Sequence, residues 1–268
     1  MKKLAIVTGA TSGIGQATAR KLASIGYDLV VTGRRGDRLQ QTADSIAAEF
    51  GSEVRTLCFD IRDNSRCEEM FGSLPEERPI DLLVNNAGLA AGLEHIDCGA
   101  TDDWNAMIDT NIKGLLYTTR IISKRMVRQG FGHIVMLGSI AGTQPYENGA
   151  VYCATKHAVH AISQSIRADL VGHGIRVSEI RPGMVETEFS VVRFHGDQRR
   201  ADNVYRDITP LSSEDIADII GWVVSRPPHV NIDDILVTPQ QQASAYLTCR
   251  SGKKIVPIYN NASLKTVK

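Results

Sequence analysis

The chain alternates short β-branched segments with longer amphipathic segments almost from end to end. The short segments have strand length and are rich in Val, Ile and Leu: residues 4–7, 29–32, 54–59, 82–84, 133–137, 176–180 and 235–237. The longer segments repeat apolar residues at helical spacing: residues 14–25, 38–49, 64–71, 104–128, 152–171 and 213–225. Strands separated by helices pair in parallel, and the helices cover both faces of the sheet. The alternation predicts an α/β fold, a single doubly wound domain with a parallel sheet of about seven strands.

This alternation also sets the expected domain boundaries. It runs over residues 1–240 without a linker, an internal repeat or a low-complexity tract, which predicts one domain. Within it, residues 183–207 form a long polar segment of the kind that closes over a substrate. The pattern is lost over residues 241–268, where we expect a C-terminal tail that serves as a lid or contacts another subunit.

Composition excludes several classes of protein. Thirty Lys and Arg balance thirty Asp and Glu, which argues against nucleic-acid binding through bulk charge. No apolar stretch approaches the ~20 residues of a membrane span, and the N-terminal apolar run ends at Thr8, too early for a secretory signal. The five scattered cysteines lack a Cys-x-x-Cys spacing and indicate free thiols in a reducing compartment. We expect a cytoplasmic protein with no nucleic-acid or membrane partner.

A glycine-rich loop follows the first predicted strand. It reads Thr8-Gly9-Ala10-Thr11-Ser12-Gly13-Ile14-Gly15, and helical periodicity begins within it. The glycines allow a tight turn and let a ligand approach the backbone closely. The helix that follows offers unpaired N–H groups and the positive end of its dipole to a pyrophosphate. The loop predicts a Rossmann-type nucleotide site, and taken alone it also fits a methyltransferase, an epimerase or a nucleotide sensor.

Further landmarks follow in a fixed order. They are Asp60-Ile61 after the third strand, Asn85-Asn86-Ala87-Gly88 after the fourth, Asn111 in the next helix, Ser139 after the fifth strand, Tyr152-x-x-x-Lys156 in the helix after it, and Pro182-Gly183-x-x-x-Thr187 after the sixth strand. With the T-G-x-x-x-G-x-G loop, the sequence resembles the short-chain dehydrogenase/reductase family over nearly all of residues 1–240. Within that family it is most similar to NADP-dependent 3-hydroxy acid and serine dehydrogenases and to related sulfoacetaldehyde reductases. The resemblance implies a homo-oligomer, commonly a tetramer.

Tyr152 and Lys156 are the predicted centre of the chemistry. Residues four apart share one face of a helix, with Cβ atoms ~5–6 Å apart. A cation at about 4 Å in an effective dielectric near 20 favours the phenolate by roughly 4 kcal/mol, or about three pK units. We therefore predict that Lys156 lowers the pKa of Tyr152 towards neutrality, and that Tyr152 is the general acid and base of a hydride transfer. The resemblance implies that Ser139 hydrogen-bonds the same substrate oxygen and that Asn111 holds a water linked to Lys156.

The resemblance also implies a set of cofactor contacts, distributed over the whole chain. They are Gly9, Thr11, Ser12, Gly13, Ile14 and Gly15 in the loop, Asp60 and Ile61 at the adenine, Asn86 on the ribose side, Tyr152 and Lys156 towards the nicotinamide ribose, and Val185 and Thr187 near the carboxamide. The alternative for Asp60 is an ordinary turn or helix-cap residue.

The end of the second strand decides between NAD and NADP. It reads Thr32-Gly33-Arg34-Arg35, without the acidic residue that binds the ribose 2′-hydroxyl of NAD. Guanidinium groups suit the charge and geometry of a 2′-phosphate. Asp37 lies beyond Gly36 and is expected to be the N-cap of a helix beginning at residue 38. We predict NADP(H), bound by Arg34 and Arg35, with solvent-facing arginines as the alternative.

The predicted lid carries the substrate information. Arg193 is our candidate for neutralising a carboxylate or sulfonate, and Tyr146 is a candidate pocket residue that equally suits the core or the surface. Arg181 brings a second positive charge to the pocket or, as we favour, pairs with Glu179 or Glu186. The leading hypothesis is an NADP(H)-dependent enzyme that interconverts a small 3-hydroxy acid, or a similar short anionic alcohol, with its aldehyde or ketone.

Other functions are weighed against this one. A sulfoacetaldehyde reductase, or a 3-oxoacyl or sugar reductase, would carry the same Tyr-Lys pair. A sensor without turnover usually has a broken Tyr-x-x-x-Lys, and an epimerase a longer C-terminal domain. Metal binding is not expected, because His157 and His160 stand three apart without a His-Glu-x-x-His pattern or a third ligand.

Overall fold

A computed structural model of the protein describes residues 2–250, and a single parallel sheet of seven strands runs through this part of the chain. The strands are β1 (Lys3–Val7), β2 (Tyr27–Gly33), β3 (Val54–Cys58), β4 (Leu82–Asn85), β5 (Gly132–Leu137), β6 (Ile175–Pro182) and β7 (Asp234–Val237). Their order in the sheet is β3-β2-β1-β4-β5-β6-β7, and every neighbouring pair is parallel. The predicted doubly wound fold is confirmed.

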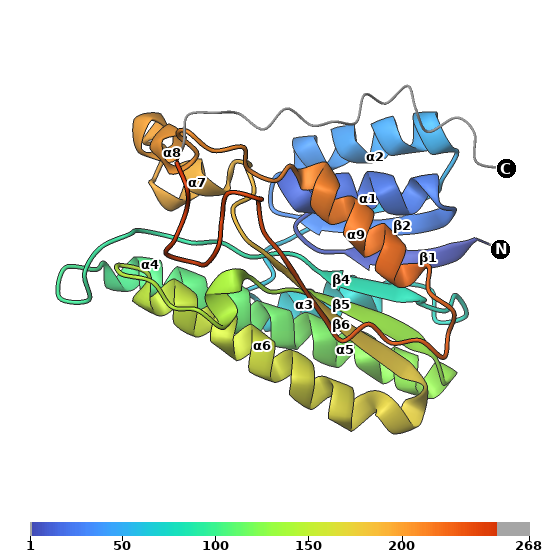
Figure 1. The fold of residues 1–268 in the computed structure, drawn as a ribbon. Helices are drawn as coiled ribbons and strands as arrows, with labels where there is room; N and C mark the ends of the chain where they lie inside the picture. The colour runs from blue at the N-terminus through green and yellow to red at the C-terminus, as the bar shows by residue number, and fades with distance from the viewer. Residues whose placement is uncertain (1, 251–268) are drawn as a thin grey trace, which may run out of the picture.

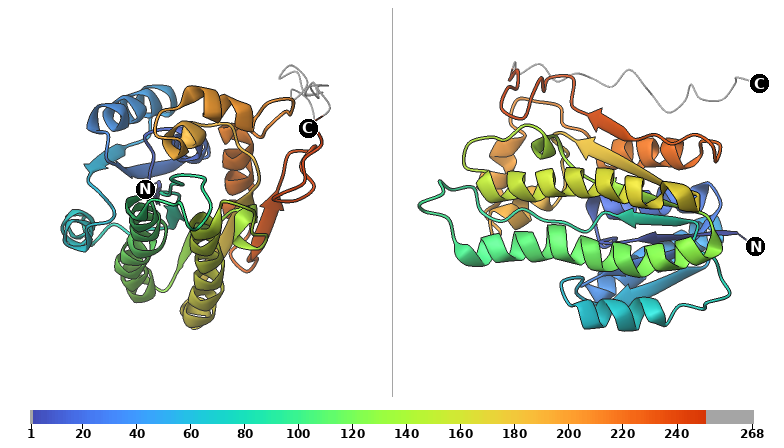
Figure 2. Two further views of the ribbon diagram at one scale, coloured as in Figure 1. Left: turned by 90° about the vertical axis from the view of Figure 1, so that its left-hand side faces the viewer. Right: turned by 90° about the horizontal axis from the view of Figure 1, so that it is seen from below.

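Helices cover both faces of this sheet (Figures 1 and 2). The long ones are α1 (Gly13–Ser24), α2 (Gly36–Phe50) and α9 (Ser213–Val224) on one face, and α3 (Asn64–Gly72), α5 (Leu115–Gln129) and α6 (Ala150–Leu170) on the other. The shorter ones are α4 (Thr101–Ile108), the π-helical η1 (Asp109–Gly114), the 3₁₀ turns η2 (Ile140–Gly142) and η3 (Val171–His173), α7 (Phe189–Arg193) and α8 (Gln198–Val204).

Each central strand supplies both hydrophobic cores in alternation. In β1, Leu4 and Ile6 pack into the core beneath α3, α5 and α6, whereas Ala5 and Val7 pack into the core beneath α1, α2 and α9. Successive side chains of a strand point to opposite faces, so a strand covered on both sides must be apolar throughout. This is why the strand segments of the sequence read as unbroken runs of Val, Ile, Leu and Ala.

Two helix boundaries differ from the predictions. The single helix expected over residues 104–128 begins at Thr101, contains the π-helical η1 and ends at Gln129. Asp37 is not an N-cap, because α2 already begins at Gly36, with Arg35 in the capping position and Asp37 in the first turn. A carboxylate in the first turn stabilises a helix through its dipole without capping it, which explains why Asp37 resembled a start signal.

The strand order places a crevice beside β1. The chain leaves β1 for β2 on one side and reaches β4 on the other, so the connections diverge at the carboxyl ends of these strands. Ligands of doubly wound sheets bind in the crevice at such a switch point. The segment after β6 lies beyond this edge and contains α7 and α8 (Figure 1), so the polar loop expected over residues 183–207 is partly helical.

We predict that Phe71→Ala strongly destabilises the protein. Phe71 is 1% exposed and meets the Phe59 ring edge-on, with centroids 5.5 Å apart. Truncation of such a side chain leaves a cavity that costs about 3–5 kcal/mol of unfolding free energy, measurable by urea denaturation. Phe131→Ala, at a ring that is 42% exposed, is the matched control and should cost less than about 1 kcal/mol. Equal losses for the two variants would contradict this account of the core.

Candidate active site

A cavity of about 850 Å³ lies at the carboxyl ends of the strands. With the exception of Asn111, every residue predicted for cofactor or substrate lines it: Gly9, Thr11, Ser12, Gly13, Ile14, Gly15, Arg34, Arg35, Asp60, Ile61, Asn86, Ser139, Tyr146, Tyr152, Lys156, Val185, Thr187 and Arg193. Residues up to 184 positions apart in the chain, from Gly9 to Arg193, thus share one hollow. The fold brings the predicted set together.

The glycine loop closes tightly over the end of β4. A Cβ on Gly15 would lie 2.4 Å from both Asn86 Nδ2 and the carbonyl oxygen of Gly9. Gly9 and Gly13 adopt φ of 68° and 55°, in the left-handed region that favours glycine. The side chain of Ser12, the residue before α1, makes no capping hydrogen bond, so no cap takes the first-turn N–H groups. These donors at a helix N-terminus suit a pyrophosphate.

Tyr152 and Lys156 lie one turn apart on α6. The ammonium group of Lys156 donates a hydrogen bond to the carbonyl oxygen of Leu137 (2.8 Å) and lies 6.0 Å from the centre of the Tyr152 ring. Ser139, at the end of β5, hydrogen-bonds Tyr152, and its hydroxyl also accepts a bond from the amide of Ala141 (3.1 Å). The three side chains therefore meet where β5 ends against α6.

Burial, rather than the neighbouring cation, dominates the acidity of this group. Burial raises the pKa of Tyr152 above its ordinary value, and the hydrogen bond with Ser139 and the charge of Arg193 offset only part of the rise. Burial likewise lowers the pKa of Lys156 to about 8, with the charge of Glu179 acting in the opposite direction. The predicted lowering of the Tyr152 pKa by Lys156 is therefore wrong for this structure. A nearby cation favours the phenolate, but the loss of solvent around both groups favours the neutral phenol and outweighs it.

Asn111 is buried in the π-helical η1, and its side chain forms hydrogen bonds with Leu89 and Thr155. Its amide nitrogen donates to the carbonyl oxygen of Leu89 (2.8 Å) and to the hydroxyl of Thr155 (3.0 Å), while its oxygen accepts the amide of Leu89 (2.9 Å). A Cβ on Gly88 would lie 3.2 Å from that oxygen and 3.8 Å from Lys156 Nζ. Asn111 and Lys156 therefore both lie close to Gly88, which has no side chain to separate them, although Asn111 does not line the cavity.

The two arginines after β2 have different surroundings. Arg35 donates to the hydroxyls of Thr11 (3.0 Å) and Ser12 (2.7 Å) and forms an ion pair with Glu188 (2.8 Å). Within residues 2–250, nothing forms a side-chain hydrogen bond or ion pair with Arg34, whose charge acts on nearby Asp60. Burial alone would raise the pKa of Asp60, but hydrogen bonds from Arg62 and the charges of Arg62 and Arg34 hold it below its usual range.

Arg193 ends helix α7 of the lid beside Tyr152. Its Nη1 donates to the Tyr146 hydroxyl (3.0 Å) and its Nε to the carbonyl oxygen of Gly92 (3.0 Å). Its guanidinium carbon lies 5.6 Å from the ring centres of both Tyr146 and Tyr152. The third nitrogen, Nη2, is buried and has no hydrogen-bond partner among the described residues. A buried donor without a partner is unusual, and in a guanidinium group it suits an anionic ligand.

Arg181 pairs with neither of its predicted partners and does not line the cavity. It forms an ion pair with Asp234 (2.8 Å) on the edge strand β7 and donates to the hydroxyl of Thr143 (2.9 Å). The register of β6 and β7 pairs Glu179 with Asp234 across the sheet, so Asp234 comes within reach of Arg181. Both predictions for Arg181, a charge in the pocket and a pair with Glu179 or Glu186, are therefore wrong. The reason is that the pairing of β6 with β7 brings in Asp234, which lies 53 residues further along the chain.

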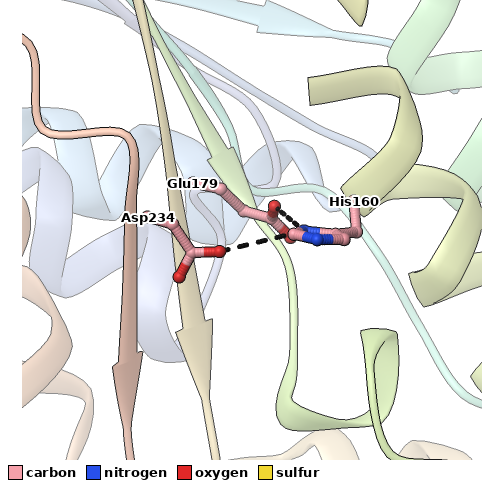
Figure 3. Close-up of side chains that lie close together, drawn as sticks. All are labelled: His160, Glu179 and Asp234. Atoms are coloured by element: carbon pink, nitrogen blue, oxygen red, sulfur yellow. Dashed lines mark hydrogen bonds and ion pairs between the residues drawn. The ribbon is translucent and has the colours of Figure 1, made fainter. Parts of the chain in front are cut away.

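Two carboxylates gather around His160 behind the active site (Figure 3). His160 Nδ1 lies 2.6 Å from Glu179 Oε2 and 3.8 Å from Asp234 Oδ2. The sequence offered no such partners, because they come from β6 and β7. Arg181 already balances the charge of Asp234, so the cluster forms an ion-pair network, and the absence of a metal remains a prediction. His157, by contrast, bonds the carbonyl oxygen of Cys153.

Several cavity residues were not anticipated. The described part of the tail contributes Gln242, Ala245, Tyr246, Thr248 and Arg250, and the amide of Ala245 bonds Gln144 (2.9 Å). In the lid, the ring of Phe189 meets Tyr152 with centroids 5.7 Å apart. No sequence pattern marks these residues, because each acts through a contact made by folding. Residues 251–268 of the predicted tail lie outside the described part of the chain.

Comparison with known proteins agrees with this geometry. Residues 3–197 match the family model described as short chain dehydrogenase. The chain belongs to the short-chain dehydrogenase family. The predicted family and enzyme class, an oxidoreductase acting on CH–OH groups, are therefore confirmed. Within residues 2–250, no helix combines the length and apolar character that a membrane crossing requires.

Individual relatives within the family are similar along almost the whole chain. NADP-dependent 3-hydroxy acid dehydrogenase YdfG of Salmonella typhi is 46% identical over 247 residues, which cover 91% of this chain and 98% of the relative. Serine 3-dehydrogenase of Agrobacterium fabrum is 44% identical over 90% of this chain and 95% of its own length. A solved closed form of serine dehydrogenase complexed with NADP+ has a TM-score of 0.86 at 43% identity, covering 92% of this chain and 98% of that structure. These names agree with the cofactor predicted from Arg34 and Arg35.

We predict that Lys156 makes the stability of the protein depend on alkaline pH. Its pKa is about 8 in the fold and about 10.4 in an unfolded chain, so between these values the unfolded state binds more protons. The unfolding free energy should then rise with pH over this range. The destabilisation caused by the buried Lys156 ammonium group should reach its full size only below about pH 8. Urea denaturation of wild type and Lys156→Met should diverge in favour of wild type by about 2 kcal/mol from pH 7.5 to 9.5. Parallel curves would contradict a buried, titrating lysine.

Proposed function

We propose that the protein is an NADP(H)-dependent dehydrogenase that interconverts a small 3-hydroxy acid with its aldehyde or ketone. The observation that carries the proposal is Arg193: its buried Nη2 has no partner among the described residues, and its guanidinium carbon lies 5.6 Å from the centre of the Tyr152 ring. Arg193 is half-buried and has no ion-pair partner among the described residues, and such a cation favours an anionic ligand because burying charge without a partner is costly. The 3-hydroxy acid and serine dehydrogenases among the relatives support the same substrate class.

The cavity suits NADP(H). The uncapped N-terminus of α1 suits the pyrophosphate, and the Gly15 position leaves no room for a side chain between the loop and Asn86. Arg34 and Arg35 would hold the 2′-phosphate, as guanidinium groups commonly do. The remaining cofactor residues that we assign are Gly9, Thr11, Ser12, Gly13, Ile14, Asp60, Ile61, Val185 and Thr187. When bound, the nicotinamide supplies or accepts the hydride.

Tyr152 would donate the proton to the substrate oxygen and recover it in the reverse direction. The raised pKa keeps its hydroxyl protonated at neutral pH, the form that a proton donor requires. Ser139 would hold the same oxygen, since it already hydrogen-bonds Tyr152. Lys156 would act as the local positive charge, and its lowered pKa makes it a proton carrier close to neutrality. Asn111 would complete the path from Lys156 by holding a water, as the family resemblance implies.

The position of Arg193 also fits one alternative function, a sulfoacetaldehyde reductase of the same fold. A guanidinium recognises a sulfonate as well as a carboxylate, so a sulfoacetaldehyde reductase would use Arg193 in the same way. Tyr146 would position Arg193 for a carboxylate and for a sulfonate alike, because its hydroxyl accepts a hydrogen bond from Arg193 Nη1.

We also propose that the chain assembles as a homo-oligomer, a tetramer by family resemblance. The edge strand β7 and the adjoining helix α9 support this assembly. Leu236 and Trp222 leave 43% and 48% of their surfaces exposed there. An apolar sheet edge of this kind suits coverage by another copy of the chain.

We predict that Tyr152→Phe abolishes turnover while the cofactor still binds. The substitution removes only the hydroxyl, so NADPH affinity measured by fluorescence titration should stay within about threefold of wild type. Loss of a positioned general acid lowers turnover by about 10²–10⁴-fold. Turnover is followed as NADPH oxidation at saturating aldehyde. Near-wild-type turnover would remove Tyr152 from the mechanism.

We predict that Arg193→Met removes the preference for anionic substrates. The assay compares neutral, carboxylate and sulfonate aldehydes of one chain length, with malonic semialdehyde as the carboxylate. Loss of a buried charged hydrogen bond should lower kcat/KM for the best anion by about 10²-fold or more and leave neutral aldehydes within a few-fold. Arg199→Met, in the same lid segment, is the control. If the neutral aldehyde is preferred and Arg193→Met has no effect, the 3-hydroxy acid proposal fails; if the sulfonate is preferred, the alternative holds.

A further inference from the structure

The lid residue Glu188 engages the arginines next to the predicted cofactor phosphate site. Glu188 follows Thr187 directly and precedes α7. Its Oε2 accepts a hydrogen bond from Arg35 Nη1 (2.8 Å), and its Oε1 accepts one from Arg38 Nη1 (2.5 Å). One carboxylate therefore bridges two guanidinium groups 150 or more positions earlier in the chain.

The donors of Arg35 leave little choice for a second anion. Its Nε and Nη2 are turned to the glycine loop, where they donate to Thr11 and Ser12. Nη1 is the remaining end of the guanidinium, and Glu188 takes it. A guanidinium has five N–H groups in a rigid fork, so a phosphate that binds Arg35 must approach the same end.

We propose that Glu188 is a cofactor-specificity residue: its carboxylate competes with the 2′-phosphate of NADP(H) for Arg35 and so limits how strongly the enzyme prefers the phosphorylated cofactor. The inference rests on the proposed NADP(H) dependence. Both groups are anions, and at one guanidinium they repel each other as well as sharing its donors.

Two further features allow Arg35 to exchange Glu188 for a phosphate. Arg38 lines an adjoining hollow together with Glu188 and does not line the cofactor cavity, so Glu188 can keep this partner when Arg35 turns to a phosphate. Hydrogen bonds from Arg38 and Arg35 lower the pKa of Glu188 to about 2, so it stays ionised at neutral pH. Arg35 and Glu188 are 43% and 44% exposed, which keeps the competition modest in size.

The test uses cofactor fragments, because they separate the phosphate from the nicotinamide. Isothermal titration calorimetry measures the dissociation constants of adenosine 2′,5′-bisphosphate and of 5′-AMP for wild type, Glu188→Gln and Glu186→Gln. Glu186 is a lid carboxylate that does not line the cavity and is the matched control. Glu188→Gln should bind the bisphosphate about threefold more tightly, the size expected for an exposed ion pair, with unchanged 5′-AMP affinity. Glu186→Gln should match wild type for both ligands.

The outcomes separate this inference from the proposed function. If wild type prefers the bisphosphate and Glu188→Gln binds it no more tightly, competition is overturned while the NADP(H) proposal stands. A weaker affinity in Glu188→Gln would likewise overturn it, since Glu188 would then be supporting Arg35. If wild type does not distinguish the bisphosphate from 5′-AMP, the NADP(H) proposal fails and takes this inference with it.

Discussion

The joint between β1 and β4 determines where everything else in the site lies. The buried hydroxyl of Thr8 accepts hydrogen bonds from the backbone N–H groups of Asn86 and Ala87 (both 3.0 Å). The side-chain Nδ2 of Asn86 donates to the carbonyl oxygens of Thr8 (2.8 Å) and Gly9 (3.1 Å). These bonds hold two strand ends together at the point where the connections diverge. Gly15 packs against this joint, and any side chain there would strike Asn86. Glycine is therefore required at position 15 by packing at the carboxyl ends of β1 and β4, whether or not a ligand is bound.

Desolvation affects the pKa values of Tyr152 and Lys156 more than the closeness of the two groups does. Tyr152 and Lys156 are both buried beneath the lid, and each is pushed towards its neutral form. The charge of Glu179 opposes the lowering of the Lys156 pKa. The Glu179 carboxylate is in turn hydrogen-bonded to His160 Nδ1 (2.6 Å). A Cβ on Gly138 would lie 2.1 Å from the Glu179 carboxylate, so the strand end that leads to Ser139 passes directly over this charge. The ion-pair network behind the sheet therefore belongs electrostatically to the active site.

The sequence was informative wherever function depends on local pattern. The alternation of segments predicted the sheet, and the ordered landmarks placed the glycine loop, Ser139 and the Tyr152–Lys156 pair around one cavity. It failed where a partner is chosen by strand register or loop closure, as for Arg181 with Asp234, or for Glu188 with Arg35. The π-helical turn around Asn111 was missed because a single wide turn scarcely disturbs the apolar periodicity of the surrounding helix. The sign of the Tyr152 pKa shift was missed because burial cannot be read from a four-residue spacing.

The lid is attached to the rest of the domain at both ends of α7, each time through arginine. At one end Glu188 joins it to Arg35 and Arg38 after β2. At the other, Arg193 binds the carbonyl oxygen of Gly92 through its side chain and the amide of Gly92 through its own carbonyl oxygen (2.9 Å). Only the short helix α7 separates these attachments. Since the loops after β2 and β4 flank the crevice on opposite sides of β1, the lid spans the crevice from the adenosine side to the substrate side. A change of charge at Arg35 therefore acts on the same short segment that carries Arg193, the residue proposed to bind the substrate.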